Sequence, residues 1–154
     1  MIFFMASCTA VVGLNLETVQ NATRNKDLDM LITHLEKGEF SYIRERAAEG
    51  LRQVPFDKAQ SNAVPVLRQC VGNSAEKGFV RAQCAVTLGK WGVDEATGDI
   101  ITALTQVDEE SRYWLAVALR GLSTPEAKAQ LQELSNDPDV YLSTSVRQWL
   151  ESTR

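Results

Sequence analysis

Side chains with nucleophilic or metal-binding chemistry are few in this sequence. They are one histidine, His34, and three widely spaced cysteines, Cys8, Cys70 and Cys84. Zinc and iron sites need several ligands at short fixed spacings, and catalysis by a Cys–His pair needs a geometry that these spacings do not indicate. The carboxylates are numerous but form no recognisable acid–base pair. We therefore expect no catalytic residues, no metal site and no cofactor.

The cysteines also bear on the compartment in which the protein works. Three is an odd number, and the wide spacing does not resemble a disulfide framework. Cys84 falls on an apolar helical face, where a thiol packs as a small hydrophobic group. These features predict buried free thiols in a reducing compartment, and hence a cytoplasmic protein.

The first fourteen residues, MIFFMASCTAVVGL, carry no charge. They are too short to span a bilayer and lack the basic start of a signal peptide. We expect residues 1–14 to cap the core or to form an interface in a homo-oligomer, and residues 15–154 to form one domain. Two alternatives stay open: a targeting remnant with export or lipidation at Cys8, because MASC resembles a lipoprotein cleavage box, and a true start at Met5.

The charge distribution argues against nucleic acid as a partner. The chain has 16 Lys and Arg against 20 Asp and Glu, a net charge of -4, and no run of basic residues. Binding to phosphate backbones requires a basic patch. GKWG, which begins at Gly89, lacks the spacing of a phosphate-binding loop.

An internal repeat appears when three stretches are aligned on Arg44, Arg81 and Arg112. Small or apolar residues recur three and four positions after each arginine, and leucine recurs seven after. These offsets lie on one face of a helix. A weaker fourth copy places Leu142 at the aligned position. The shared positions are Ala47, Cys84 and Leu115, then Ala48, Ala85 and Ala116, then Leu51, Leu88 and Leu119.

A second kind of helix lies between these copies. Ser61–Val71, Ala96–Val107 and Pro125–Leu134 each have an apolar face, and Thr124 before Pro125 is a typical helix start. Upstream, helices are predicted over 25–38, ending at Gly38, and over 15–25. Because one helix pair cannot bury its own apolar face, stacked pairs must share a core. The pattern predicts an all-α, right-handed αα superhelix of about four helix pairs.

The motifs IRERAAEGL, VRAQCAVTLGKWG and NAVPVL resemble HEAT-like repeats of the phycobilisome-lyase type. The resemblance covers about Lys26 to Ser152 and is specific for architecture rather than function. It implies that each arginine pairs with an acidic residue near the turn before it, in a structural ladder. The acidic residues in that place are Glu39, Glu76, and Asp108 or Glu109.

The resemblance also implies that the second helices line a concave face. Residues opposite their apolar stripes give a polar strip, rich in Gln and Thr, that suits an extended peptide or another protein. Tyr113 and Trp114 are a further candidate, since exposed aromatic pairs dominate interface energies. The strip consists of Met30, Thr33 and Lys37, then Pro65 and Gln69, then Asp99, Thr102 and Gln106, and finally Lys128 and Gln132.

These observations predict a non-enzymatic scaffold that binds another protein or peptide on its concave face, of bacterial origin and without a membrane span. The alternative, implied by the resemblance, is a bilin-lyase-type or chromophore-protein-handling subunit. A pulldown that recovers a tetrapyrrole-carrying protein would favour that alternative. No thiol or histidine groove in the sequence supports it.

Overall fold

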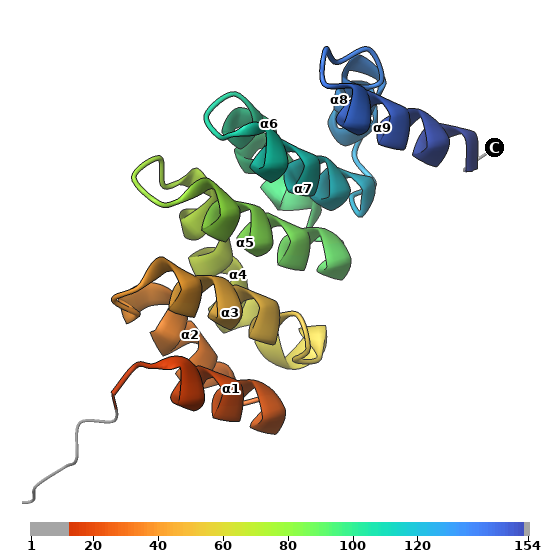
Figure 1. The fold of residues 1–154 in the computed structure, drawn as a ribbon. Coiled ribbons are helices and arrows are strands. Elements are labelled where there is room, and N and C mark those ends of the chain that lie inside the picture. Colours follow the sequence, from red (N-terminus) through yellow and green to blue (C-terminus); the bar gives the residue numbers. More distant parts are fainter. Residues whose placement is uncertain (1–12, 153–154) are drawn as a thin grey trace, which may run out of the picture.

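The chain folds into two layers of helices that stack along one axis. The computed structural model describes residues 13–152, and Figure 1 shows one layer in front of the other. No β-strand occurs between these two residues. The odd-numbered layer contains α1 (Leu16–Asn25), α3 (Ser41–Leu51), α5 (Gly78–Trp91), α7 (Glu109–Arg120) and α9 (Val140–Ser152). The even-numbered layer contains α2 (Leu28–Lys37), α4 (Phe56–Gly72), α6 (Thr97–Leu104), which follows the short 3₁₀ helix η1 (Asp94–Ala96), and α8 (Pro125–Leu134).

Successive helices form four hairpin pairs: α2 with α3, α4 with α5, α6 with α7, and α8 with α9. Helix α1 precedes them and packs on both α2 and α3. The odd-numbered helices run in the same direction, with their N-terminal ends on the left of Figure 1. The predicted all-α stack of four helix pairs is confirmed.

The buried side chains follow the repeat register read from the sequence. The residues three, four and seven positions after Arg44, Arg81 and Arg112 are all buried. The fourth copy is different, because Leu142 is buried while Tyr141 is 67% exposed. Leu142 therefore occupies the place of Ile43 and Val80, one position before the arginines. The predicted register of the fourth copy was wrong by one residue, because no arginine marks it.

From α1 to α7, the odd-numbered layer is the more closely packed of the two. Its tightest contact joins α5 and α7, where Gly89 lies against the backbone of Ala118 and Gly121 lies against the backbone of Gly89. A Cβ atom on either glycine would overlap these backbone atoms. In a curved stack of helices, the layer with the closer spacing lies on the inside of the curve.

The arginines of the repeat pair with residues in the turn of the following repeat. Each reaches across to a side chain 25 or 32 residues later. The expected partners in the preceding turn were wrong: Glu39 offers Arg44 only its backbone carbonyl, and Asp108 caps α7 through the amide of Ser111. The sequence pattern could not separate these choices, because acids occur in every turn. The three pairs are Arg44–Glu76, Arg81–Gln106 and Arg112–Asp137.

Three even-numbered helices differ from their predicted boundaries. Helix α2 begins at Leu28 rather than Asn25. Helix α4 begins at Phe56 rather than Ser61 and continues through Pro65 for 17 residues. The residues between Pro55 and Ser61 therefore belong to the helix, where Ala59 is buried. Helix α6 is shorter than predicted at both ends, because η1 precedes it and it stops at Leu104. Helix α8 begins with Thr124 as its N-cap, as predicted.

Cys70 and Cys84 form a disulfide that joins α4 to α5. The prediction of free thiols at these two positions was wrong. The hairpin turn between the helices brings the two Cα atoms to 6.4 Å across a separation of 14 residues. The expectation of a reducing compartment depended on free thiols, and these two cysteines no longer support it.

Several predictions concern residues outside the described range. Residues 1–12 carry Cys8, Met5 and most of the apolar segment 1–14. The ideas of a cap, an interface, a targeting remnant or a later start therefore stay predictions. Among the helices that the structure describes, none has the length and apolar character needed to cross a bilayer.

Candidate functional site

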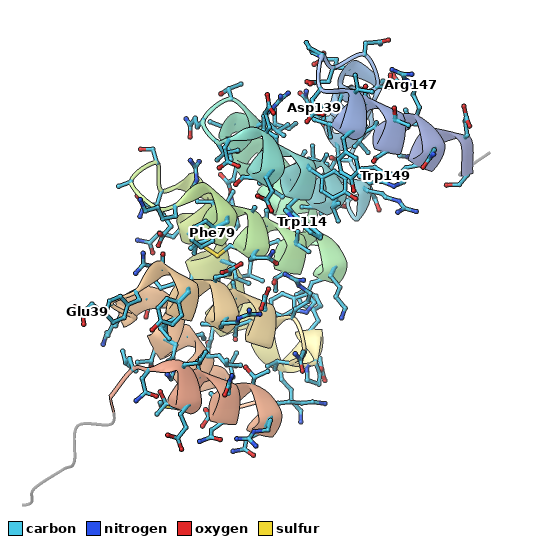
Figure 2. The ribbon with its side chains drawn as sticks, in the orientation of Figure 1. Glu39, Phe79, Trp114, Asp139, Arg147 and Trp149 are labelled. Atoms are coloured by element: carbon cyan, nitrogen blue, oxygen red, sulfur yellow. A yellow bond between two sulfur atoms is a disulfide. The ribbon has the colours of Figure 1, made fainter. Side chains whose placement is uncertain are left out.

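The exposed large hydrophobic side chains lie on one side of the molecule. Every such side chain within residues 13–152 belongs to an odd-numbered helix, or to the turn just before one. Each lies within the first two helical turns, so that the set follows the N-terminal ends of the odd-numbered layer. Figure 2 shows Phe79 and Trp114 as neighbours on this face. We call this set the aromatic edge: Leu16, Phe40, Tyr42, Phe79, Trp114, Val140 and Tyr141.

The aromatic edge contains a hollow of about 460 Å³ that spans three neighbouring helices. Phe79 on α5 and Trp114 on α7 are its apolar walls, and Trp114 is 37% exposed. Gln83 on α5 also lines the hollow, with its side-chain oxygen 2.5 Å from an Arg52 nitrogen that donates to it. The remaining lining residues are Glu45, Asp108, Glu110 and Ser111.

A second hollow, of about 410 Å³, adjoins the first and is formed by α7 and the start of α9. Tyr113 lies between three other rings, with centroid distances of 5.3 Å to Trp114, 5.0 Å to Tyr141 and 5.9 Å to Trp149. These rings form the contact between α7 and α9. The hollow is lined by Glu109, Glu110, Tyr113, Trp114, Asp139 and Tyr141.

The charged groups that line both hollows are all carboxylates. Burial raises the pKa of Glu45 above its ordinary value, and the negative charges of Glu49 and Glu110 raise it further, against a smaller opposing effect of Arg46. Asp108 is different, because the Ser111 amide donates to it and lowers its pKa. The aromatic edge is therefore acidic as well as apolar.

The predicted polar strip falls on the even-numbered layer, and the structure brings only part of it together. Lys37 on α2 and Gln69 on α4 line one hollow of about 370 Å³, together with Cys70 of the disulfide. Pro65 lines a separate hollow of about 540 Å³. Lys128 and Gln132 are exposed on α8 but line neither of these hollows.

Other members of the strip are already engaged inside the protein. Asp99 forms a salt bridge of 2.7 Å with Arg68 on α4. The Gln106 side chain accepts a hydrogen bond from Arg81. The hydroxyl of Thr33 donates to the carbonyl of Asp29, and that of Thr102 to Gly98. Met30 is half-buried and packs against the core.

The only histidine has a structural role. His34 is fully buried on α2, and its Nδ1 donates to the Met30 carbonyl at 2.6 Å. Its Nε2 lies 2.8 Å from the Thr18 hydroxyl on α1, so that the ring links the first two helices. Thr18 also completes the capping box of α1 with Asn15.

The sequence singled out one member of the aromatic edge, Trp114, together with its neighbour Tyr113, but not the others. One signal was present: Tyr42 and Phe79 both lie two positions before a repeat arginine. On a helix that begins at this point, that offset faces away from the buried positions three and four after the arginine. Tyr141 was assigned to the core stripe only because the fourth copy was misaligned.

The comparison with known families agrees with this architecture. No curated protein matches the sequence. A family model described as HEAT repeats matches residues 28–120, from the start of α2 to the end of α7. This range exceeds half of the 154 residues. It contains three of the four helix pairs and all three repeat arginines. The chain therefore belongs to the HEAT-repeat family.

Proposed function

We propose that this chain is a protein-binding module without chemistry of its own, and that it holds its partner against the aromatic edge. The observation that carries the proposal is that every exposed large hydrophobic side chain of residues 13–152 lies near the N-terminal end of an odd-numbered helix. Clustered exposed apolar groups mark interaction surfaces, and aromatic side chains supply most of the energy of such interfaces. HEAT repeats generally mediate protein–protein interactions, which supports the same function.

The polar strip of the even-numbered layer remains the competing surface. Its free members are Lys37, Gln69, Lys128 and Gln132, and they offer hydrogen bonds but no large apolar side chain. The close spacing of the odd-numbered helices supports the aromatic edge instead, because a partner held inside the curve of the stack would face the odd-numbered layer. Two sets of substitutions can separate these surfaces.

The test compares affinity capture by three forms of the full chain, with recovered proteins quantified by mass spectrometry. One variant carries Phe79→Ser and Trp114→Ala, and the other carries Gln69→Ala and Thr102→Ala. We expect the wild type and the second variant to recover the same protein, and the first variant to lose it. Circular dichroism must show that both variants stay folded.

Other outcomes of this capture would point elsewhere. Loss of the partner only in the Gln69→Ala and Thr102→Ala variant would move the binding surface to the even-numbered layer. Recovery of a tetrapyrrole-carrying protein would favour the chromophore-handling role that the phycobilisome-lyase resemblance implies. Turnover of a captured small molecule would contradict the non-enzymatic role.

The Cys70–Cys84 disulfide supports work in an oxidising compartment rather than in the cytoplasm, because cytosolic thiols are kept reduced. Acid quenching of cells, followed by alkylation in denaturant, measures this directly. We expect neither Cys70 nor Cys84 to be modified before reduction. Modification of both cysteines before reduction would show that the protein works in a reducing compartment.

Self-association through the apolar segment 1–14 is a separate part of the proposal. The segment has no charge, and the ends of a helical stack need a cover. Light scattering on the full chain and on a chain that starts at Leu14 gives the two masses. A dimer that becomes a monomer on truncation supports an interface, whereas two monomers of equal stability exclude one.

A further inference from the structure

The two hollows of the aromatic edge are neighbours. Both are lined by Glu110 and Trp114 on α7, so that these two side chains lie where the hollows meet. Together the hollows extend from α3, across α5 and α7, to the start of α9. We call the two hollows together the acidic groove. Its aromatic walls are Phe79, Tyr113, Trp114 and Tyr141, and its carboxylates are Glu45, Asp108, Glu109, Glu110 and Asp139.

No lysine or arginine lines the acidic groove, whose lining residues all lie within the described part of the chain. The arginines on the same helices already have partners. Arg46 pairs with Glu49, Arg112 pairs with Asp137, and Arg52 donates to Gln83. Arg46 acts on Glu45 from outside the groove, and backbone amides donate to Asp108 and Asp139, but no positively charged side chain lies among the carboxylates of the groove.

Two of the carboxylates also repel one another across the groove. Glu45 on α3 and Glu110 on α7 line the same hollow, and the pKa of Glu45 is raised chiefly by burial and by the charge of Glu49, with a further contribution from Glu110. A positive group placed between them would relieve this repulsion. Nearby exposed rings add a second attraction, because the face of a tryptophan or tyrosine attracts a lysine or arginine.

We infer that the acidic groove binds a basic segment of a partner protein, in which lysine or arginine side chains lie between the carboxylates and against the aromatic rings. This inference rests on the proposed function and names the chemistry of the partner. Charge complementarity of this kind selects partners and speeds their association. The length of the groove, which is lined by residues of four repeats, suits an extended chain.

Two other occupants fit the groove less well. A second copy of this chain has a net charge of -4, so that its surface would add negative charge to an acidic groove. The segment 1–14 of the same chain has no charged side chain and would leave the carboxylates unpaired. A basic segment satisfies both the charge and the aromatic faces.

Selection from a random 12-residue peptide library on the immobilised full chain tests the inference without a known partner. We expect enrichment of lysine and arginine over aspartate and glutamate among the bound peptides. The best peptide is then titrated by calorimetry against the wild type, the Gln69→Ala and Thr102→Ala variant, and three further variants. The substitution Glu110→Gln should weaken its binding about threefold to tenfold, and Trp114→Leu should do the same.

Glu133→Gln is the matched control, because it removes the same charge from exposed α8 in the other layer. Binding to this variant should stay within about twofold of the wild type. Equal weakening by Glu133→Gln and Glu110→Gln would show that only net charge matters and would overturn the inference. Selection of no peptide, or of acidic or neutral peptides, would also overturn it.

The same experiment separates this inference from the proposed function. Neutral peptides that lose binding to the Trp114→Leu variant would disprove a basic partner and leave the aromatic edge as the binding surface. Peptides that bind the Trp114→Leu variant normally, but not the Gln69→Ala and Thr102→Ala variant, would disprove both. Melting temperatures close to that of the wild type are required of every variant.

Discussion

Arg44 and Glu76 form a bidentate ion pair between consecutive repeats. The Arg44 Nε lies 2.5 Å from one carboxylate oxygen, and a terminal nitrogen lies 2.8 Å from the other. A second terminal nitrogen donates to the carbonyl of Gly38 at 2.6 Å. One side chain thus holds the end of α2 and the turn after α4 against the start of α3. Paired hydrogen bonds between charged groups are among the strongest in proteins.

Replacement of Glu76 by glutamine is expected to lower the free energy of unfolding by about 2 kcal/mol, because Arg44 is largely buried and loses its countercharge. Urea denaturation at neutral pH measures the change. Glu36 lines the same hollow but is exposed, so that Glu36→Gln should cost less than about 0.5 kcal/mol. Equal effects of the two substitutions would contradict the role given to the pair.

Acid should destabilise the protein through Glu76 and Asp137. Burial raises the pKa of each, but hydrogen bonds from Arg44 to Glu76 and from Arg112 to Asp137, with help from backbone amides, outweigh it and leave both below their ordinary values. A lowered pKa stabilises the fold above the unfolded-state pKa, and this contribution is lost as pH falls through the folded-state pKa. The free energy of unfolding should therefore decrease as the pH falls below 4.5, the ordinary pKa of glutamate.

Unfolding curves recorded at a series of pH values test this expectation. The loss between neutral and acidic pH should be smaller in Glu76→Gln and in Asp137→Asn than in the wild type. An unchanged acid dependence in both variants would show that other carboxylates control acid unfolding.

A countercharge beside Arg81, the second of the three repeat arginines, should stabilise the protein. Arg81 is only 1% exposed, and its side-chain partners are the Val71 carbonyl and the neutral Gln106. Burial lowers the pKa of Arg81, which shows the cost of a charge without a countercharge. Gln106→Glu would supply one and should raise the unfolding free energy by about 1 kcal/mol at neutral pH. Gln132→Glu adds the same charge on exposed α8 and should have little effect, and a similar gain there would contradict the explanation.

The close contact of α5 and α7 should not tolerate a larger residue. Gly121→Ala places a Cβ against the Gly89 backbone and should cost about 1–3 kcal/mol or more. Gly98 on α6 has no heavy atom within 4 Å of an added Cβ, so that Gly98→Ala should instead stabilise by up to about 1 kcal/mol. Thermal melts of the two variants should shift in opposite directions. A shift of the same sign would disprove the steric explanation.

Loss of the disulfide should destabilise the α4–α5 hairpin. Closing a loop of 14 residues stabilises a protein by about 3 kcal/mol, so that a reducing agent should lower the urea midpoint. The variant with both Cys70→Ala and Cys84→Ala should show no response to the reducing agent. A wild type that is equally insensitive would show that the bond does not form in solution.

The architecture was predictable because helical periodicity and internal repetition both indicate the same buried positions. The buried positions after Arg44, Arg81 and Arg112 were read correctly, since each repeat has to pack against its neighbours. The register failed only at Tyr141 and Leu142, where no arginine marks the fourth copy. The Cys70–Cys84 bond was missed because it depends on how two helices turn back on each other, which spacing in the sequence does not reveal.

The candidate site was predicted only in part, for a different reason. Polar positions opposite an apolar stripe can be listed from a helical wheel, but whether they are free depends on neighbouring repeats. Asp99 and Gln106 were on that list, and both are bound by arginines from other helices. Phe79 and Tyr42 were absent from it, because they lie in the odd-numbered layer. Their gathering on one face is a property of the stack and not of any single helix.

The direction of the arginine contacts has a mechanical consequence. Each repeat arginine reaches forward to the turn of the next repeat, so that repeats are linked in the order in which they are synthesised. The last link, Arg112–Asp137, is the only one of the three that holds the α8–α9 pair. A pulling force applied at the C-terminal end would load this link first. Rupture would then proceed one repeat at a time toward α1.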